Sequence, residues 1–401
     1  MSKLKRDLTM EQQLARGPMD LPFLMLVVLL TAIGVIMVLS ASYATAVREE
    51  RSATHYFVRQ AAFALVGFVF MYLASKVNYQ WYRWGSVLVL GLAFLLLVLV
   101  LIPGFHTVRS DGVKRWLKMP GIGAFQPSEV AKLGVILYFS ARMSKRNTEK
   151  RKTYDTRKPS GVILQALEDW GFMELVPYGG ILLAIIVLMY FEPHMSGTIL
   201  ILIPAAAILF AGGVKLRWFA LGGSVVGGLL AIIVTTTDYM TRRITLWRDP
   251  WSLPRQGGYQ IIQSLYAIGS GGLFGVGFGQ GRQKQGFLPE PENDFIFSIV
   301  CEELGLIGAG LILALFVLLI LRGYWIALHA RDRFGSLLVV GITTLMAVQV
   351  FLNISVVTNF LPTTGVSLPF FSYGGTALMI QLIEMGIVLG VSRQIPAPKQ
   401  G

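Results

Sequence analysis

The sequence is poor in charged residues, which make up only 14% of its 401 residues, whereas a soluble domain carries about 25%. It contains a single cysteine, Cys301, so no disulfide can form within the chain. The four histidines lie far apart in the sequence, and no Cys/His cluster has the spacing of a zinc site. Neither a GxGxxG nor a Walker A pattern can be fitted, so nucleotide binding has no motif support.

Apolar residues are abundant instead, at 54% of the chain with a mean hydropathy of +0.62. Apolar runs long enough to span about 30 Å of hydrocarbon recur along the whole chain. The sequence therefore predicts an all-α integral membrane protein with about ten transmembrane helices. The expected spans cover about residues 19–42, 56–75, 84–103, 128–143, 175–192, 197–213, 217–235, 294–321, 334–358 and 368–392.

The net charge of +13 is explained by membrane topology and does not call for a nucleic acid partner. With the N-terminus inside, Lys and Arg are concentrated in the inner segments, most strongly in residues 142–158 with eight basic side chains. This bias places the tails 1–18 and 394–401 in the cytoplasm and residues 19–393 in the membrane domain. The expected location is the cytoplasmic (inner) membrane.

Of the twelve basic residues on the outer side, ten lie in two long loops, four in 104–127 and six in 236–293, the second loop lying between the seventh and eighth spans. Such clusters favour an anionic ligand, or alternatively pairing with nearby carboxylates and lipid phosphates. Residues 257–286 contain ten glycines together with many apolar side chains. We expect a partly re-entrant loop packed over a groove, since irregular backbone at membrane depth must be buried or line a cavity.

Carboxylates run from the end of this loop into the next apolar helix, where each is costly and calls for a function or a partner. Asp294 is expected to begin the helix, with Asn293 as its N-cap. Asp294 then serves either to accept a hydroxyl proton or to stabilise the helix start. Glu302 and Glu303 are expected to pair with a buried base.

The other long outer loop ends at a second polar group. Ser128 is expected to cap the fourth span, which places Glu129 and Lys132 on one helical face as a functional pair or a structural ion pair. Trp116, next to Arg115, is either an interfacial belt residue or a platform for a sugar or headgroup. A third polar segment, residues 353–375, carries no charge and is expected to pack against the groove.

These segments resemble the SEDS family (shape, elongation, division and sporulation), which includes FtsW, RodA and SpoVE. The residues of the motifs are closer to the FtsW and SpoVE branch than to RodA. The blocks that carry the resemblance are Arg115-Trp116, Gln126-Pro127-Ser128-Glu129 with Lys132, Gly258-Tyr259-Gln260 with Gln263-Ser264, Ile268 to Gly272, Leu288-Pro289-Glu290 with Asp294 to Phe297, and Leu368-Pro369-Phe370 with Ser372 to Gly375.

The resemblance implies a peptidoglycan glycosyltransferase that polymerises lipid II, an undecaprenyl pyrophosphate disaccharide-pentapeptide, at the outer face of the membrane. It also implies a class B penicillin-binding transpeptidase as partner. The family's essential acidic residue corresponds to Asp294, which would act as the general base. The residues expected to contact substrate are Arg115, Trp116, Glu129, Lys132, Arg243, Gln263, Lys284, Glu290 and Ser372. No cofactor is indicated, and a divalent cation, Mg²⁺ or Mn²⁺, is left open.

The sequence departs from the family pattern at three places. Glu292 and Asn293 replace the usual His-Thr or Gln-Thr before the aspartate, His194 stands where the family has an aspartate, and Leu253 replaces an acidic residue. Two other functions remain open at this point: a lipid II flippase and a non-catalytic scaffold of a division complex. The intramembrane charges lie near the outer side, which favours catalysis over transport.

Overall fold

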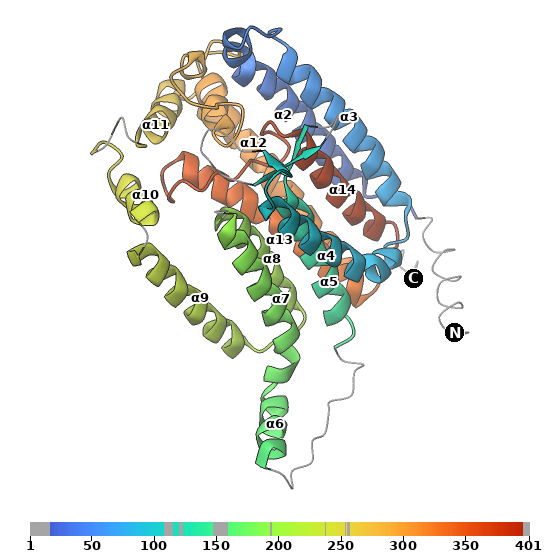
Figure 1. Ribbon diagram of the computed structural model, residues 1–401. Coiled ribbons are helices and arrows are strands. Elements are labelled where there is room, and N and C mark those ends of the chain that lie inside the picture. The colour runs from blue at the N-terminus through green and yellow to red at the C-terminus, as the bar shows by residue number, and fades with distance from the viewer. Residues whose placement is uncertain are drawn as a thin grey trace.

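The computed structural model describes residues 17–107, 115–119, 123–146, 159–192, 195–236, 238–252, 254 and 257–395. Each of the ten expected spans coincides with a helix (Figure 1). These helices are α2 (Leu21–Arg48), α3 (His55–Lys76), α4 (Gln80–Leu101), α5 (Pro127–Met143), α7 (Phe172–Phe191), α8 (Met195–Ala211), α9 (Leu216–Thr236), α12 (Ile296–His329), α13 (Arg333–Val357) and α14 (Gly375–Ser392). Within the described residues, seven are long and apolar enough to cross a membrane: α2, α3, α4, α7, α12, α13 and α14. The prediction of a multi-pass, all-α membrane protein is confirmed.

The segments between the spans contain regular structure that the sequence analysis did not predict. Helix α6 (Pro159–Trp170) precedes α7, and the long loop before α12 contains α10 (Asp238–Arg248), α11 (Tyr259–Gly271) and the short 3₁₀ helix η1 (Gln283–Gln285). The loop before α5 forms a small antiparallel sheet of β1 (His106–Thr107), β2 (Trp116–Met119) and β3 (Gly123–Phe125). Thr107 pairs with Trp116, and Leu117 pairs with Phe125.

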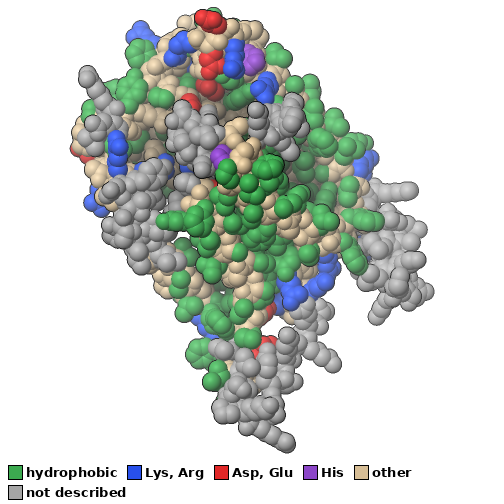
Figure 2. Space-filling model, in the orientation of Figure 1, with side chains coloured by type: hydrophobic (Ala, Val, Ile, Leu, Met, Phe, Trp, Pro, Cys, Tyr) green, Lys and Arg blue, Asp and Glu red, His purple; other side chains and the backbone are tan. Residues whose placement is uncertain are grey.

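Helices α13 and α14 occupy the interior of the bundle. In the most apolar stretch of 18 residues, 72% of the residues are buried in both α13 and α14, against 17% in α7. Helix α13 packs against α5, α8 and α12, while α14 packs along α3. The space-filling view shows a broad hydrophobic face, with charged side chains mainly toward its two ends (Figure 2). This arrangement fits helices that bury one side against each other and present the other to lipid.

Helix α12 is broken at Gly305, whose φ of 69° lies outside the helical region. The glycine-rich segment after α11 supplies partners for the backbone groups freed by the break: Val276 N donates to Glu302 O over 3.0 Å, and Leu306 N donates to Gly272 O over 2.9 Å. A Cβ at Gly275 would lie 2.2 Å from Glu303 O, so only glycine permits this approach. The expected re-entrant loop is therefore a backbone partner of the interrupted helix.

Three expected helix starts were wrong, those of α12, α5 and α14. The first residue of α12 is Ile296, preceded by Phe295 as N-cap, so Asp294 lies before the helix and Asn293 does not cap it. Helix α5 begins at Pro127 and not at a Ser128 cap.

Helix α14 begins only at Gly375 because the apolar residues before it are buried in the protein and do not span lipid. Leu368, Phe370 and Phe371 are each at most 2% exposed, and Phe370 stacks on Phe316 of α12 with ring centroids 6.4 Å apart.

The contact between α11 and α12 can be tested at two glycines of α11. A Cβ at Gly271 would lie 2.0 Å from Cys301 O, whereas a Cβ at Gly269 would meet no atom within 4 Å. We expect Gly271→Ala to destabilise the protein by about 1–3 kcal/mol, as overpacking does. Gly269→Ala is the matched control and is expected to be neutral or stabilising by up to about 1 kcal/mol. Thermal melting in detergent measures both, and equal melting temperatures would contradict the packing.

Candidate functional site

A cavity of about 850 Å³ lies at one end of the bundle. Its walls come from the end of α2, the start of α3, the sheet, the start of α5, the loop 286–294 and the loop 365–374. The two described ends of the chain lie at the other end of the bundle, where Asp20 N donates to Ser392 Oγ over 3.2 Å. The cavity therefore lies on the side that the charge distribution assigns to the outside.

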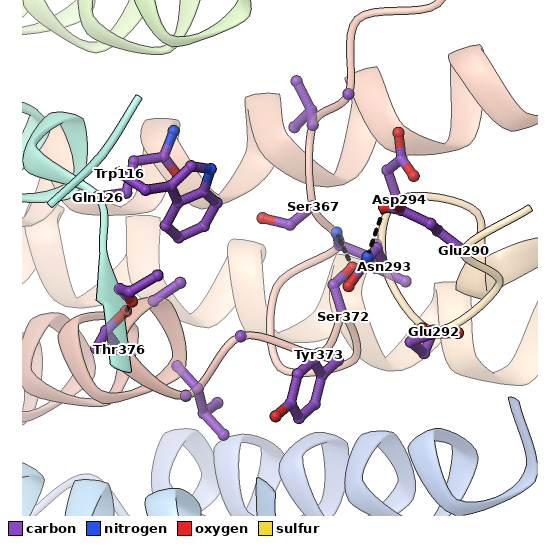
Figure 3. A pocket seen from close by; sticks show the side chains of 18 of the residues that line it. Trp116, Gln126, Glu290, Glu292, Asn293, Asp294, Ser367, Ser372, Tyr373 and Thr376 are labelled. Carbon is purple, nitrogen blue, oxygen red and sulfur yellow. Dashed lines mark hydrogen bonds between the residues drawn. The ribbon is translucent and has the colours of Figure 1, made fainter. Parts of the chain in front are cut away.

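Asp294 lines the cavity from the loop that precedes α12, and its side chain is half-buried. Its backbone is fixed by α13, because Asn353 Nδ2 donates to Asp294 O over 2.7 Å and to Val366 O over 2.8 Å. In Figure 3 Asp294 lies with Glu290, Glu292 and Asn293 on one wall. One amide thus ties together the two loops that form this part of the cavity.

Glu292 joins the same loop to its neighbours. Its side chain is 5% exposed and accepts a hydrogen bond from Thr45 Oγ1 of α2 over 3.3 Å, while its carbonyl accepts from Tyr373 N over 2.8 Å. Burial raises the pKa of Glu292, and the nearby charge of Glu290 raises it further, although the bond from Thr45 opposes the shift. The carboxylate that replaces the family's usual residue is therefore built into the loop, not free in the cavity.

Trp116 and Gln126 lie on the wall opposite Asp294 (Figure 3). Trp116 is held on β2, and Arg115 before it donates from Nε to Glu192 O over 3.4 Å. Because the indole lines the cavity, its position fits the platform interpretation of Trp116.

Deeper in the cavity, Lys132 Nζ lies 2.7 Å from Glu129 Oε2, and their side chains are 2% and 10% exposed. The ion pair expected from the spacing is therefore present, and both residues line the cavity. Glu384 of α14, 4% exposed, adds a further carboxylate near this pair.

The loop before α14 closes the cavity with uncharged groups. Ser372 Oγ accepts from Leu368 N over 2.7 Å, and Gln60 Nε2 of α3 donates to Ser372 O over 3.2 Å. Ser372 and Glu290 both line the cavity. Of the ten residues named from the sequence, the structure thus brings seven together: Arg115, Trp116, Glu129, Lys132, Glu290, Asp294 and Ser372.

Arg243, Gln263 and Lys284 do not line the cavity. Arg243 donates from a terminal guanidinium nitrogen to Thr363 O over 2.7 Å, Gln263 lies on α11, and Lys284 is 2% exposed and bonded to Glu303 and Ser40. Their expected contacts with substrate remain predictions. His194 and Leu253, two of the family departures, lie outside the described residues.

Two cations at the cavity were missed by the sequence analysis. Arg48 ends α2 and Arg59 lies in the first turns of α3, and both line the cavity. The Arg48 guanidinium packs directly against Gly286: a Cβ added to this glycine would lie 2.7 Å from both terminal guanidinium nitrogens. The signal for Arg59 was present in the sequence, since an ionisable residue inside a span is a functional candidate by default.

The residues that the structure describes contain no group of three or more His, Cys, Asp or Glu side chains that could hold a metal ion. Mg²⁺ and Mn²⁺ are octahedral, and Mg²⁺ usually binds through one or two carboxylates together with water and substrate phosphates, so the described carboxylates do not by themselves form a complete protein site for either ion. The possible divalent cation remains a prediction, and we assign no step to it.

The sequence matches the family described as cell cycle protein, comprising FtsW, RodA and SpoVE, over residues 20–396. The chain belongs to this family, which confirms the resemblance drawn from its motifs. It is 41% identical over 380 residues to a probable peptidoglycan glycosyltransferase FtsW of Geobacter metallireducens, covering 94% of this chain and 95% of the relative. It is 40% identical over 377 residues to stage V sporulation protein E of Bacillus subtilis, covering 93% and 97%.

Solved structures share the fold. A chain from a peptidoglycan synthase complex that coordinates polymerization and crosslinking matches with a TM-score of 0.71 at 25% identity, covering 94% of this chain and 98% of that one. The rod shape determining protein RodA of Thermus thermophilus matches with a TM-score of 0.63 at 24% identity, covering 95% and 99%. The overall fold of this chain is thus shared with both of these solved proteins.

Glu192 provides a test of the buried wall beside Arg115. Its side chain is fully buried, and among the described residues neither carboxylate oxygen has a hydrogen-bond partner. Burial raises its pKa from 4.5 to about 8, although the charge of Arg115 opposes the shift. The folded protein therefore holds an extra proton across that interval, so its stability falls as the pH rises from 4.5 to about 8. We expect Glu192→Gln to melt at a higher temperature than the wild type above about pH 8 and to lose that advantage near pH 4.5.

Melting curves at several pH values measure this difference, with Glu50→Gln, an exposed carboxylate, as the control for loss of one acidic side chain. An advantage of Glu192→Gln that stays constant with pH would contradict the assignment.

Proposed function

We propose that this protein is a peptidoglycan glycosyltransferase that polymerises lipid II at the outer face of the cytoplasmic membrane. The observation that carries the proposal is the cavity itself: a half-buried aspartate faces a tryptophan, between arginines and a lysine, at one end of a membrane bundle. Its relatives include a protein named as a probable peptidoglycan glycosyltransferase. The cavity lies at one end of the bundle, and a lipid-linked sugar would meet water at such an end.

In the reaction, the Asp294 carboxylate accepts the proton of the acceptor GlcNAc 4-hydroxyl as the oxygen attacks the anomeric carbon of the MurNAc that ends the growing strand. A glycosidic bond forms at that carbon while its bond to the pyrophosphate oxygen breaks, and undecaprenyl pyrophosphate leaves with the electron pair. General base catalysis of this kind typically contributes about 10²–10⁴-fold to the rate.

The cations of the cavity suit the charge that develops on the leaving group. Arg48, Arg59 and Arg115 line it from three different segments of the chain, and guanidinium groups match phosphate oxygens in geometry. Preorganised charges of this kind stabilise a leaving anion without reorganising during the reaction. Trp116 offers a flat apolar surface on which a sugar ring can rest. The mixture of cations, carboxylates and one indole is suited to a charged lipid-linked saccharide.

The polymerase is favoured over a flippase because the charged lining belongs to the outer ends of α2 and α3, the start of α5 and two loops at the same end of the bundle. A transport path needs polar groups through the full depth of the membrane. We further propose that both termini are cytoplasmic and that a class B penicillin-binding transpeptidase is the partner. A related fold occurs in a peptidoglycan synthase complex, which supports such a partner.

The proposal is tested by supplying the purified protein with labelled lipid II and separating the glycan strands by gel electrophoresis. We expect Asp294→Ala to lower the polymerisation rate by about 10²-fold or more while melting behaviour is retained, because the acceptor loses its base. Asp249→Ala is the matched control, since Asp249 is an exposed carboxylate of the same outer segment that does not line the cavity.

Polymer made by Asp294→Ala at the wild-type rate would end the assignment of the base. Lipid II transport without polymer from the wild type would instead favour the flippase.

A divalent-ion requirement is checked in the same assay. Polymerisation is measured with EDTA and after adding back Mg²⁺ or Mn²⁺. Because the described residues lack a complete ligand set, we expect EDTA to leave the melting temperature unchanged, whatever its effect on rate. A drop in melting temperature on chelation would reveal a resident ion bound by the chain itself.

A further inference from the structure

A buried charged cluster lies beneath the cavity and takes no part in the reaction proposed above. Lys284 Nζ bonds both Glu303 Oε1 and Ser40 Oγ, and Ser40 Oγ in turn donates to the Glu303 carboxylate over 2.7 Å. The Lys284 and Glu303 side chains are 2% and 0% exposed. Three separate segments meet here: α2, the loop after α11 and α12.

The same face of α12 holds the neighbouring loop through its amide groups. The Glu302 carboxylate accepts from Arg282 N over 2.7 Å and from Gln283 N over 3.2 Å. Glu303 also accepts from Gly279 N over 3.0 Å. These bonds secure segment 279–284 to the helix just before its break at Gly305.

This secured segment leads directly into the wall that carries Asp294. Leu288 N donates to Gln283 O over 2.8 Å, so the start of the wall is hydrogen-bonded to the held segment. Helix α2 then contacts the wall twice more, through the Arg48 guanidinium against Gly286 and through Thr45 on Glu292. Ser40, Thr45 and Arg48 thus connect one helix to successive points between residues 284 and 292.

We propose that Lys284, Glu303 and Ser40 are positioning residues that set the location of loop 286–294, and through it the Asp294 carboxylate, and that Lys284 does not contact the substrate. The inference rests on the proposed role of Asp294 as the base. It assigns Lys284 a different role from the substrate contact expected from the sequence.

The two roles predict opposite outcomes when both charges are removed. Breaking a buried ion pair by removing one partner leaves an uncompensated charge, whereas replacing both partners is often neutral. If Lys284 positions the loop, neutralising Glu303 as well should restore activity. If Lys284 binds the pyrophosphate, the second change cannot replace the lost cation.

The experiment measures steady-state polymerisation of labelled lipid II by Lys284→Met, Glu303→Gln and the double variant. We expect each single variant to lower kcat by about 10–100-fold, because a small displacement of a reacting group has effects of that size. KM should stay close to the wild-type value, since binding contacts are intact. The double variant should recover most of the lost kcat.

Arg322→Met is the matched control. Arg322 pairs with Asp20 over 2.7 Å and so joins the same two helices, α12 and α2, at the other end of the bundle. Its loss should lower the melting temperature and leave kcat unchanged. Ser40→Ala keeps both charges and serves if Lys284→Met fails to fold; it should lower kcat by a smaller factor at unchanged KM.

The proposal is overturned by a raised KM in Lys284→Met that the second substitution does not correct, by wild-type kcat in both Lys284→Met and Ser40→Ala, or by a kcat loss in Arg322→Met equal to that in Lys284→Met. A wild-type protein that makes no polymer would overturn the proposed function instead, so the two failures are distinguishable.

Discussion

The structure depends on one constraint: a polar group inside the bilayer must find its partner within the protein. The break in α12 at Gly305 frees backbone groups at membrane depth, and the glycine-rich segment after α11 satisfies them with its own backbone. The carboxylates of Glu302 and Glu303 then take up further amide groups of that segment. Hydrogen bonds to α12 therefore hold the segment that leads into the loop carrying Asp294.

The charges of the cavity fall into two groups with different consequences. Glu129 with Lys132 is a buried pair, and Glu292 is built into the loop by Thr45 and Tyr373. Arg48, Arg59 and Arg115 instead line the open volume around Asp294 and Trp116. An anion that enters meets cations on several sides, and Asp294 lies among them as the carboxylate that we propose accepts the proton of the sugar hydroxyl.

Sequence reasoning succeeded where a single local property decides the outcome and failed where packing overrides it. Hydropathy over about 20 residues suffices to locate a span, so each expected span coincides with a helix. Asn293 and Ser128 have the residue types of N-caps, yet the helices begin at Ile296 and Pro127. Leu368, Phe370 and Phe371 are buried inside the protein, the two phenylalanines against Phe316 of α12. Hydropathy alone cannot distinguish such burial from contact with lipid.

The sequence by itself determined that the chain is a membrane protein, where its spans lie and that Asp294, Trp116, Glu129 and Lys132 belong to one motif set. Only the tertiary structure decided which charges face the cavity. Lys284 was expected there but is bonded to Ser40, 244 positions away in the sequence, while Arg48 lies at the cavity wall. The physical reason is that the direction of a charged side chain depends on which distant backbone and side-chain groups offer it a partner, and no local pattern encodes that.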